Sequence, residues 1–307
     1  DQYESNGLSQ YEHEPSGAGG MSPGQRLLHQ SPHPRRLLIA GNQVGKTRGL
    51  AAETWWMALG THPYRDSPGA HSIGWVMCAD LKGGWVNFSA KLREIQPPGV
   101  LHPSVTYDSS RGYTHRSVKM LRLNNGSLIV GKSGTQEVMA LTGATIDYLM
   151  IDELPKQAHF AEALTRVAVS SGPVVMSFTP IGRPCDWLRF HVEGNPDTGK
   201  PPLEDWTIQR IALNHDNCPH RSIESIERQI AGYGPWEYAQ RVEGAWEGTT
   251  SDRWIAFSED NIFTEAPEKV QALGLGWDHG ERPGNSVCYL VAWDSSRLWV
   301  LDEYVSQ

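Results

Sequence analysis

Residues 39–51, with the sequence IAGNQVGKTRGLA, contain the parts of a phosphate-binding loop. An apolar run precedes the loop, Lys46 and Thr47 end it, and helix-forming residues follow. In such a loop, backbone N–H groups surround phosphate oxygens, the lysine contacts the β- and γ-phosphates, and the hydroxyl binds Mg²⁺. Because Ala40 holds the usual first glycine position, the motif is a relaxed form. We expect ATP to bind at Gly41, Asn42, Gln43, Val44, Gly45, Lys46 and Thr47.

A second apolar run, residues 148–151, is followed by Asp152 and Glu153. Enzymes with a phosphate-binding loop need a carboxylate at the end of a second strand to hold Mg²⁺, and a glutamate beside it can activate the attacking water. The pattern predicts Asp152 and Thr47 as metal ligands, and Glu153 and Lys46 as catalytic residues. Two solvated acids at a strand end are the alternative, and the loop upstream argues against it.

A third apolar run, GPVVMSFTP at 172–180, contains Ser177 and Thr179 near its end. Ligands of parallel α/β sheets bind at the carboxyl ends of the strands, so these hydroxyls are expected at the same edge as the loop and the acids. There they can sense the γ-phosphate and couple its loss to movement. A local turn before Pro180 explains the two residues equally well.

The spacing of these motifs predicts an α/β fold of the ASCE or RecA-like P-loop type with a mostly parallel sheet, because buried apolar runs alternate with helical stretches between 25 and 184. One exception is 121–130, LRLNNGSLIV, which predicts a hairpin with Asn-Gly at its turn. We expect a flexible arm at 1–24, an ATPase core at 25–200, a helical lid or linker at 201–255, a linker at 256–268, and the start of another domain at 269–307.

Composition limits the function only weakly. The 307 residues carry a formal net charge of -8, which neither implies nor excludes a nucleic-acid partner.

Four widely separated cysteines favour a reducing cytoplasm. Because no apolar run reaches the roughly 18 residues of a membrane span, we expect a soluble protein with no membrane partner. The chain starts without methionine and stops after a strand-like run, so we expect that it is cut from a longer polypeptide.

With AGNQVGKT, YLMIDE and SFTP in this order, the chain resembles the large terminase subunit of tailed bacteriophages over most of residues 25–248. The resemblance implies an ATP-hydrolysing motor that moves double-stranded viral DNA into a procapsid. It also implies a homo-oligomeric ring, a portal protein and a small terminase subunit as partners, and a place in the host cytoplasm, transiently at the procapsid portal. In that family a glutamine before the loop contacts adenine, and Gln25 matches it, although an ordinary surface glutamine is the alternative.

One departure from the family concerns an arginine. Some members carry an arginine inside the loop where this chain has Asn42. Charge stabilisation during phosphoryl transfer must then come from elsewhere, and an arginine finger from a neighbouring subunit is one source. Arg111 and Arg116 are the candidates, ranked above Arg122, with solvated or DNA-facing arginines as the alternative.

The resemblance further implies an RNase H-like nuclease after the motor, which cuts concatemeric DNA with two divalent ions, Mg²⁺ or Mn²⁺. Asp278, in LGLGWDHG, matches the first metal ligand, and Asp302 or Glu303 is a possible second one. A turn-forming aspartate is the alternative for Asp278. Because further ligands would follow residue 307, we expect nuclease activity only in a longer chain.

Two other functions fit the same motifs. A helicase or other remodelling ATPase shares the acids but needs a second motor lobe, which the sequence does not show. A nucleotide-binding scaffold would hold ATP without rapid turnover. The substitution Glu153→Gln separates the scaffold from a motor, because only a motor loses hydrolysis while it still binds nucleotide.

Overall fold

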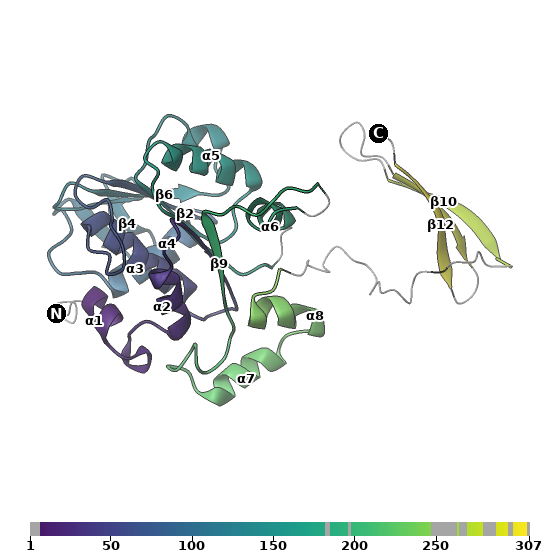
Figure 1. The fold of residues 1–307 in the computed structure, drawn as a ribbon, viewed down its shortest axis with the longest axis horizontal. Helices are drawn as coiled ribbons and strands as arrows, with labels where there is room; N and C mark the ends of the chain where they lie inside the picture. Colours follow the sequence, from purple (N-terminus) through teal and green to yellow (C-terminus); the bar gives the residue numbers. More distant parts are fainter. Residues whose placement is uncertain are drawn as a thin grey trace. The chain divides into compact units, whose positions relative to one another are not determined.

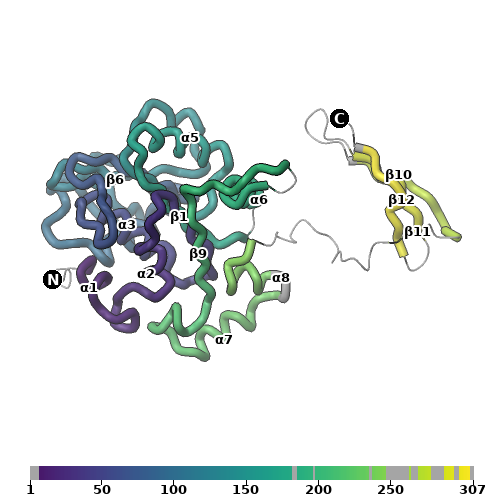
Figure 2. Tube along the Cα trace, viewed as in Figure 1, coloured from purple at the N-terminus to yellow at the C-terminus, as the bar shows by residue number. Residues whose placement is uncertain are grey.

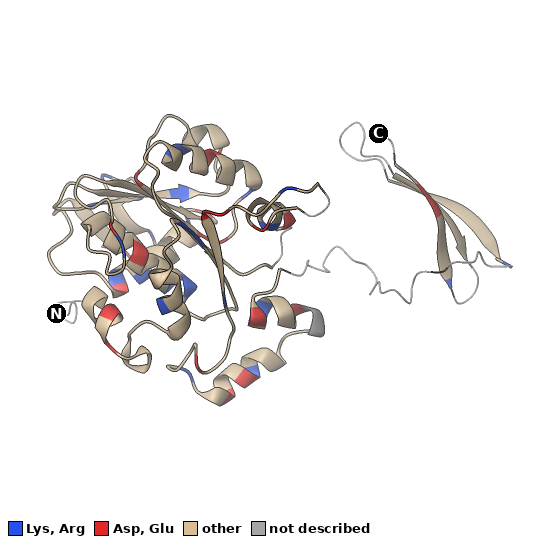
Figure 3. Cartoon of the chain, viewed as in Figure 1, with Lys and Arg blue, Asp and Glu red and all other residues tan. Residues whose placement is uncertain are grey.

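The computed structural model describes residues 7–181, 185–195, 198–246, 263, 269–278, 287–293 and 297–305. The chain forms two compact units, Asp1–Asp252 and Arg253–Gln307 (Figure 2). Lys and Arg are interspersed with Asp and Glu over the first unit (Figure 3). In the described part of the chain, none of the helices is both long and apolar enough to cross a membrane.

A seven-stranded sheet organises the first unit, in the order β5-β6-β2-β7-β8-β1-β9. Neighbouring strands pair in parallel except β5 with β6, which form the predicted antiparallel hairpin. The central strands are buried on both faces because their residues are almost all apolar, so the predicted α/β fold is confirmed. The strands are β1 (Arg35–Ala40), β2 (Ile73–Cys78), β5 (Met120–Arg122), β6 (Leu128–Ser133), β7 (Tyr148–Asp152), β8 (Val174–Phe178) and β9 (Trp206–Ile211).

Helices cover both faces of this sheet (Figure 1). Alternate strand residues separate two apolar clusters: Leu38 and Met150 belong to one, and Leu37 and Leu149 to the other. Residues of α1 (Gly7–His13), α2 (Pro23–Gln30), α3 (Lys46–Leu59) and α4 (Gly84–Glu94) pack in the first cluster. Residues of α5 (Gln157–Ala168) and α6 (Asp186–Val192) pack in the second. The sheet therefore lies between two helical layers.

The prediction of a flexible arm at 1–24 is wrong for the residues that the structure describes. Helix α1 and a 3-10 turn (Ser16–Ala18) pack against the core, where Leu8, Tyr11 and Met21 are buried. Only Leu8 and Tyr11 have helical spacing, and two residues are too few to indicate a helix from sequence. Each of the three residues nevertheless packs in the first apolar cluster. Residues 1–6 lie outside the described part.

The predicted core boundary at residue 200 is also wrong, because β9 pairs with β1 and forms an edge of the main sheet. Beyond β9 the segment predicted to be helical contains α7 (Ile223–Ala231), α8 (Pro235–Tyr238) and a short π-helix, η3 (Ala239–Glu243). Backbone bonds tie this lid to the phosphate loop and to the end of β9, since Asn42 N donates to Arg241 O at 3.0 Å and Leu213 N donates to Val242 O at 2.7 Å.

A small two-stranded antiparallel sheet, β3 (Val105–Asp108) and β4 (Gly112–His115), lies in the connection between α4 and β5. A 3-10 helix, η2 (Val138–Leu141), precedes β7.

The second unit has a three-stranded antiparallel sheet, β10 (Ala272–Asp278), β11 (Val287–Trp293) and β12 (Leu298–Val305). Most of the predicted linker at 256–268 lies outside the described residues. The RNase H-like identity of this unit stays a prediction.

Candidate nucleotide-binding site

The order of the strands brings the predicted motifs together. Strands β7, β8 and β1 are parallel neighbours, so their carboxyl ends meet at one edge of the sheet. Asp152 and Ser177 are paired residues at the ends of β7 and β8, and the phosphate loop leaves the end of β1. Thr47 and Asp152, which are 105 positions apart in sequence, thus lie within hydrogen-bond distance.

The loop itself depends on two glycines. Gly45 has a φ of 87°, and a Cβ there would lie 2.7 Å from the side-chain nitrogen of Gln25. A Cβ on Gly41 would lie 2.6 Å from Arg241 O. Helix α3 begins at Lys46, directly after the loop, so its N-terminus faces the pocket as phosphate binding requires.

Lys46 is buried and held by oxygens. Its Nζ donates to Gly41 O at 2.8 Å and to Thr179 Oγ1 at 2.6 Å. Burial lowers the pKa of the ammonium group, and the negative charges of Glu153 and Asp152 oppose this shift. The lysine is therefore already fixed beside the loop, where a triphosphate would replace its protein partners.

Asp152 forms the centre of an oxygen-lined site. Thr47 Oγ1 donates to its carboxylate oxygens at 3.1 and 3.3 Å, and Ser177 Oγ donates to Oδ1 at 3.4 Å. Burial, followed by the charge of Glu153, raises the pKa of Asp152 to about 7. A carboxylate with neighbouring hydroxyls is the donor set that suits Mg²⁺, so the residues fit the predicted metal.

Glu153 has an unusual backbone conformation at the edge of the pocket. Its φ is 78°, in the left-handed region that residues other than glycine seldom adopt, and its N–H donates to Ser177 O at 2.8 Å. The residue lines the pocket, while the surrounding protein removes part of the hydration of its carboxylate and raises its pKa. Such strain costs on the order of 1–3 kcal/mol and is typical of functional positions.

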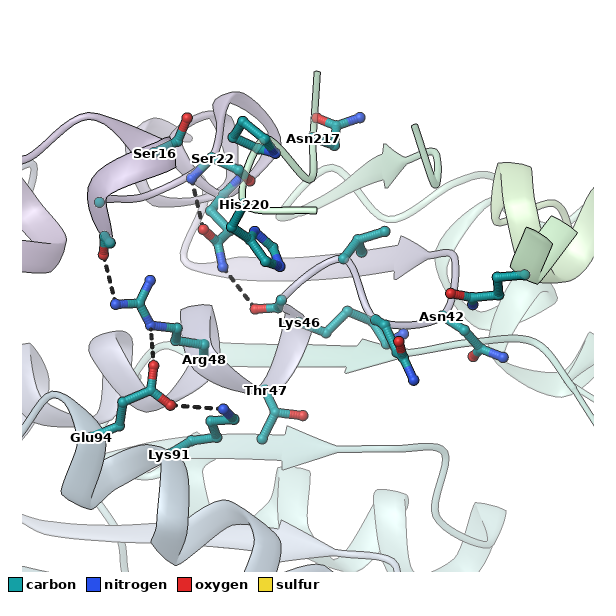
Figure 4. A pocket seen from close by; sticks show the side chains of 18 of the residues that line it. Ser16, Ser22, Asn42, Lys46, Thr47, Arg48, Lys91, Glu94, Asn217 and His220 are labelled. Carbon is teal, nitrogen blue, oxygen red and sulfur yellow. Dashed lines mark hydrogen bonds and ion pairs between the residues drawn. The ribbon is translucent and has the colours of Figure 1, made fainter. Parts of the chain in front are cut away.

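Lys46, Thr47 and Glu153 line a pocket of about 990 Å³ (Figure 4). The described lining includes Gln25, Glu153 and the predicted loop residues 42–47. It also includes residues that no motif identifies. These are Ser16, Gly19, Gly20 and Ser22 from the N-terminal segment, Arg48, Lys91 and Glu94 from α3 and α4, and Asn217, Pro219, His220, Gln229 and Tyr233 from the lid side.

Gln25 lies in this pocket against the loop. Its Nε2 donates to Gly45 O at 2.7 Å, and its Oε1 accepts from Ser22 N at 2.8 Å in a capping box at the start of α2. A side-chain amide has two donor hydrogens and two acceptor lone pairs. One donor hydrogen and one lone pair of Gln25 therefore remain beyond these two hydrogen bonds.

The two arginine candidates lie elsewhere. Arg111 is exposed in the β3–β4 turn, and Arg116 is exposed just after β4. Neither belongs to the described lining of the pocket, so neither acts on a nucleotide in its own pocket in this conformation.

Asp278 is the last residue of β10, in the second unit. The register pairs position 278 with Val287 and pairs Tyr289 with Glu303. Since strand residues two apart share a face, Glu303 rather than Asp302 lies on the same face as position 278. Among the described residues of the whole chain, no group of three His, Cys, Asp or Glu side chains forms a metal site.

The chain resembles known proteins in both sequence and fold. A family model described as "Terminase large subunit, T4likevirus-type, N-terminal" matches residues 37–262. A comparison with curated proteins finds no match. The large terminase from a thermophilic bacteriophage superposes with a TM-score of 0.57 at 16% identity, covering 93% of this chain and 68% of that chain.

Two further solved structures are similar. The large terminase ATPase domain of Thermus phage P74-26 has a TM-score of 0.51 at 19% identity, covering 71% of this chain and 91% of that chain. The large terminase of the thermophilic bacteriophage in complex with ADP has a TM-score of 0.54 at 15% identity, covering 93% of this chain and 68% of that chain. At these identities the solved structures establish the fold.

Proposed function

The chain belongs to the terminase large subunit family of the T4-like type, and we propose that it is an ATP-hydrolysing motor that moves double-stranded DNA into a viral procapsid. One observation carries the proposal. The parts of a hydrolytic site follow three parallel strands and lie at one edge of the sheet, where Lys46, Thr47 and Glu153 line a pocket. These parts are Lys46, Thr47, Asp152, Glu153 and Thr179.

Each residue then has a role in hydrolysis. Lys46 contacts the β- and γ-phosphates. Thr47 and Asp152 would hold Mg²⁺, which would supply positive charge beside the phosphates. Glu153 orients the attacking water and takes its proton, for which a carboxylate with a raised pKa is well suited. Related structures support a nucleotide ligand, because the large terminase of the thermophilic bacteriophage was solved with ADP and with ATP-gamma-S.

Gln25 provides selectivity for adenine. Its remaining N–H matches adenine N7, and its remaining lone pair matches the N6 amino group. Guanine presents acceptors at both positions, so it leaves the lone pair of Gln25 facing O6. The site should therefore prefer ATP to GTP.

Ser177 and Thr179 couple the nucleotide to movement. Thr179 holds Lys46, and Ser177 holds Asp152, so the end of β8 contacts both the phosphate side and the metal side of the site. The lid is tied to the same loop through Asn42, which gives a second path for movement.

The family supports the remaining parts of the proposal. The motor works as a homo-oligomeric ring on DNA, in which Arg111 or Arg116 reaches the pocket of a neighbouring subunit. It acts with a portal protein and a small terminase subunit in the host cytoplasm. A longer chain carries a nuclease that uses Asp278 and two divalent ions.

The test is Mg²⁺-dependent ATP hydrolysis by the wild type and by Glu153→Gln, each with and without linear double-stranded DNA. Glu137→Gln, an exposed glutamate in the connection before β7, is the matched control. We expect DNA to raise turnover, and Glu153→Gln to lower it at least about 100-fold while it still binds ATP. Turnover that survives Glu153→Gln would exclude Glu153 as the base. Wild-type binding without any turnover, with or without DNA, would favour a scaffold.

A further inference from the structure

Beside the helix that follows the phosphate loop lies a group of charged and polar side chains that the catalytic roles do not use. Glu53 of α3, Arg36 of β1, His29 of α2 and His62, which follows α3, form this Glu53 cluster. The side chains of all four are 0% exposed. Charged side chains are rarely fully buried unless they are paired, so the cluster needs an explanation.

One carboxylate bonds to Arg36 and His29 and lies close to His62. Arg36 Nη2 donates to Glu53 Oε2 at 2.8 Å, and His29 Nδ1 lies 2.7 Å from Glu53 Oε1. His62 Nε2 lies 3.3 Å from Oε2. A buried ion pair often contributes no more stability than an apolar pair of the same volume, whereas in some proteins buried polar groups specify how elements are arranged. The cluster is therefore expected to act by holding two elements in a defined relative position.

The element that the cluster fixes is α2, which carries Gln25. Gln25 and His29 are one helical turn apart on α2, and Gly45, Gly49 and Glu53 are successive turns apart along the start of α3. The two helices meet along these residues. Gln25 bonds to Gly45, its Cγ would lie 3.5 Å from a Cβ on Gly49, and His29 bonds to Glu53.

The ring of His29 is held from its other side as well. Tyr11 OH lies 2.9 Å from His29 Nε2. Because a carboxylate only accepts, Nδ1 is the donor to Glu53, and Nε2 of the neutral ring accepts from Tyr11. Burial lowers the pKa of His29, which favours this neutral form. Bonds on both sides of the ring therefore restrain the axial position of α2 relative to α3, and also the rotation of α2 about its own axis.

We propose that Glu53, acting through His29, is the positioning group for recognition of the nucleotide base. The cluster holds α2 in the register in which the free donor and acceptor of Gln25 face the pocket. A helix shifted by a fraction of a turn would still close the core, but it would misalign the two hydrogen bonds to adenine. This inference rests on the proposed function, specifically on Gln25 as the contact to adenine.

A merely structural brace would show a different result. Loss of a brace lowers stability and leaves selectivity unchanged in the folded fraction. Loss of a positioning group weakens adenine binding more than guanine binding, while the phosphate contacts of Lys46 and Thr47 are retained. The ratio of the two dissociation constants is therefore the informative measurement.

The experiment measures displacement of a fluorescent ATP analogue by ATP and by GTP, with Mg²⁺ present, on the full chain. The test variant is His29→Leu, which removes both hydrogen bonds of the ring. His29→Asn is the rescue variant, because its side-chain nitrogen replaces Nδ1 toward Glu53. Tyr11→Phe is a milder variant that removes only the hydroxyl. Val167→Ala, buried in the other apolar cluster, controls for lost stability.

We expect the wild type to prefer ATP by at least about tenfold, and His29→Leu to reduce the Kd(GTP)/Kd(ATP) ratio by about tenfold. Tyr11→Phe should lower it about two- to threefold. His29→Asn should lower it by a similar factor only, because it keeps the bond to Glu53 and loses the bond to Tyr11, and Val167→Ala should stay near the wild type. If His29→Leu fails to fold, Tyr11→Phe decides. The inference is overturned if folded His29→Leu has the wild-type Kd(GTP)/Kd(ATP) ratio. If His29→Leu does not fold, a wild-type ratio in Tyr11→Phe overturns it. In both cases the proposed function is unaffected. A wild type that does not bind ATP, or does not prefer it, overturns the proposed function itself.

Discussion

Thr179 Oγ1 lies 2.6 Å from Lys46 Nζ, although the two residues are 133 positions apart in the chain. The same hydroxyl also lies 2.9 Å from Ala40 O, at the end of β1. Thr179 therefore joins the strand that ends at the phosphate loop to the strand beside the acid pair. We therefore propose that a triphosphate bound by Lys46 would displace this hydroxyl, so that Thr179 senses the nucleotide.

The substitution Thr179→Val tests this role. The methyl group keeps the volume, and the hydrogen bonds of the hydroxyl to Lys46 and Ala40 are lost. We expect ATP affinity to change by less than about threefold, whereas DNA-stimulated turnover falls at least about tenfold. Thr165→Val, whose hydroxyl bonds to Ala161 O within α5, is the control. Unchanged stimulation by DNA in Thr179→Val would show that coupling does not pass through this hydroxyl.

The arginine finger is tested by mixing subunits. Arg111→Ala and Arg116→Ala subunits keep an intact pocket, and Lys46→Ala subunits keep both arginines but cannot hold the phosphates. If the finger acts between subunits, a mixture of a finger variant and Lys46→Ala should regain part of the ATPase activity that each lacks alone. Arg122→Ala, exposed on β5, should keep wild-type turnover by itself. No recovery in any mixture, with both variants inactive alone, would point to a source of charge in the same subunit.

Trp246 should contribute measurably to stability. Its Nε1 donates to Glu193 Oε1 at 2.7 Å, and its ring packs on Phe178 of β8 with centroids 5.8 Å apart. We expect Trp246→Phe to lower the free energy of unfolding by about 1–3 kcal/mol, because a hydrogen bond to a carboxylate and ring area are both lost.

The control for this prediction is Trp206→Phe. Trp206 is buried in the same cluster, and its Nε1 has no hydrogen-bond partner among the described residues. Urea unfolding of both variants measures the difference. Equal losses in the two variants would mean that the bond to Glu193 adds nothing to packing.

The pH dependence of stability should reveal His29. Burial lowers its pKa below the ordinary value of 6.5, so the unfolded chain binds more protons than the folded chain in the window just below pH 6.5. The free energy of unfolding then falls as the pH drops through that window, by up to about 1.4 kcal/mol per pH unit. Full stabilisation is present above pH 6.5. Since asparagine does not titrate, His29→Asn should lose less stability than the wild type between about pH 7.5 and 5.5 in urea titrations. Parallel curves would contradict the buried neutral form.

Much of the site could be predicted from local sequence. The loop at 41–47 and the acid pair Asp152 and Glu153 each come at the end of an apolar strand, as do the hydroxyls of Ser177 and Thr179. Because parallel strands align their carboxyl ends, a short motif at each end is enough to predict a shared site. The mostly parallel sheet follows from the same runs, since strands buried on both faces must be apolar throughout.

Other features were decided only by the tertiary structure. Tyr11, Gln229 and Tyr233 belong to no motif, and they reach the site or its support because chain segments far apart pack together. The Glu53 cluster could not be predicted from sequence either, because a single Glu, Arg or His in a sequence is normally solvated. Here tertiary packing buries these side chains beside one another. Local chemistry thus determined which residues can act on a phosphate. Packing between distant segments decided which other residues line the pocket, because contacts between such segments leave no pattern in the local sequence.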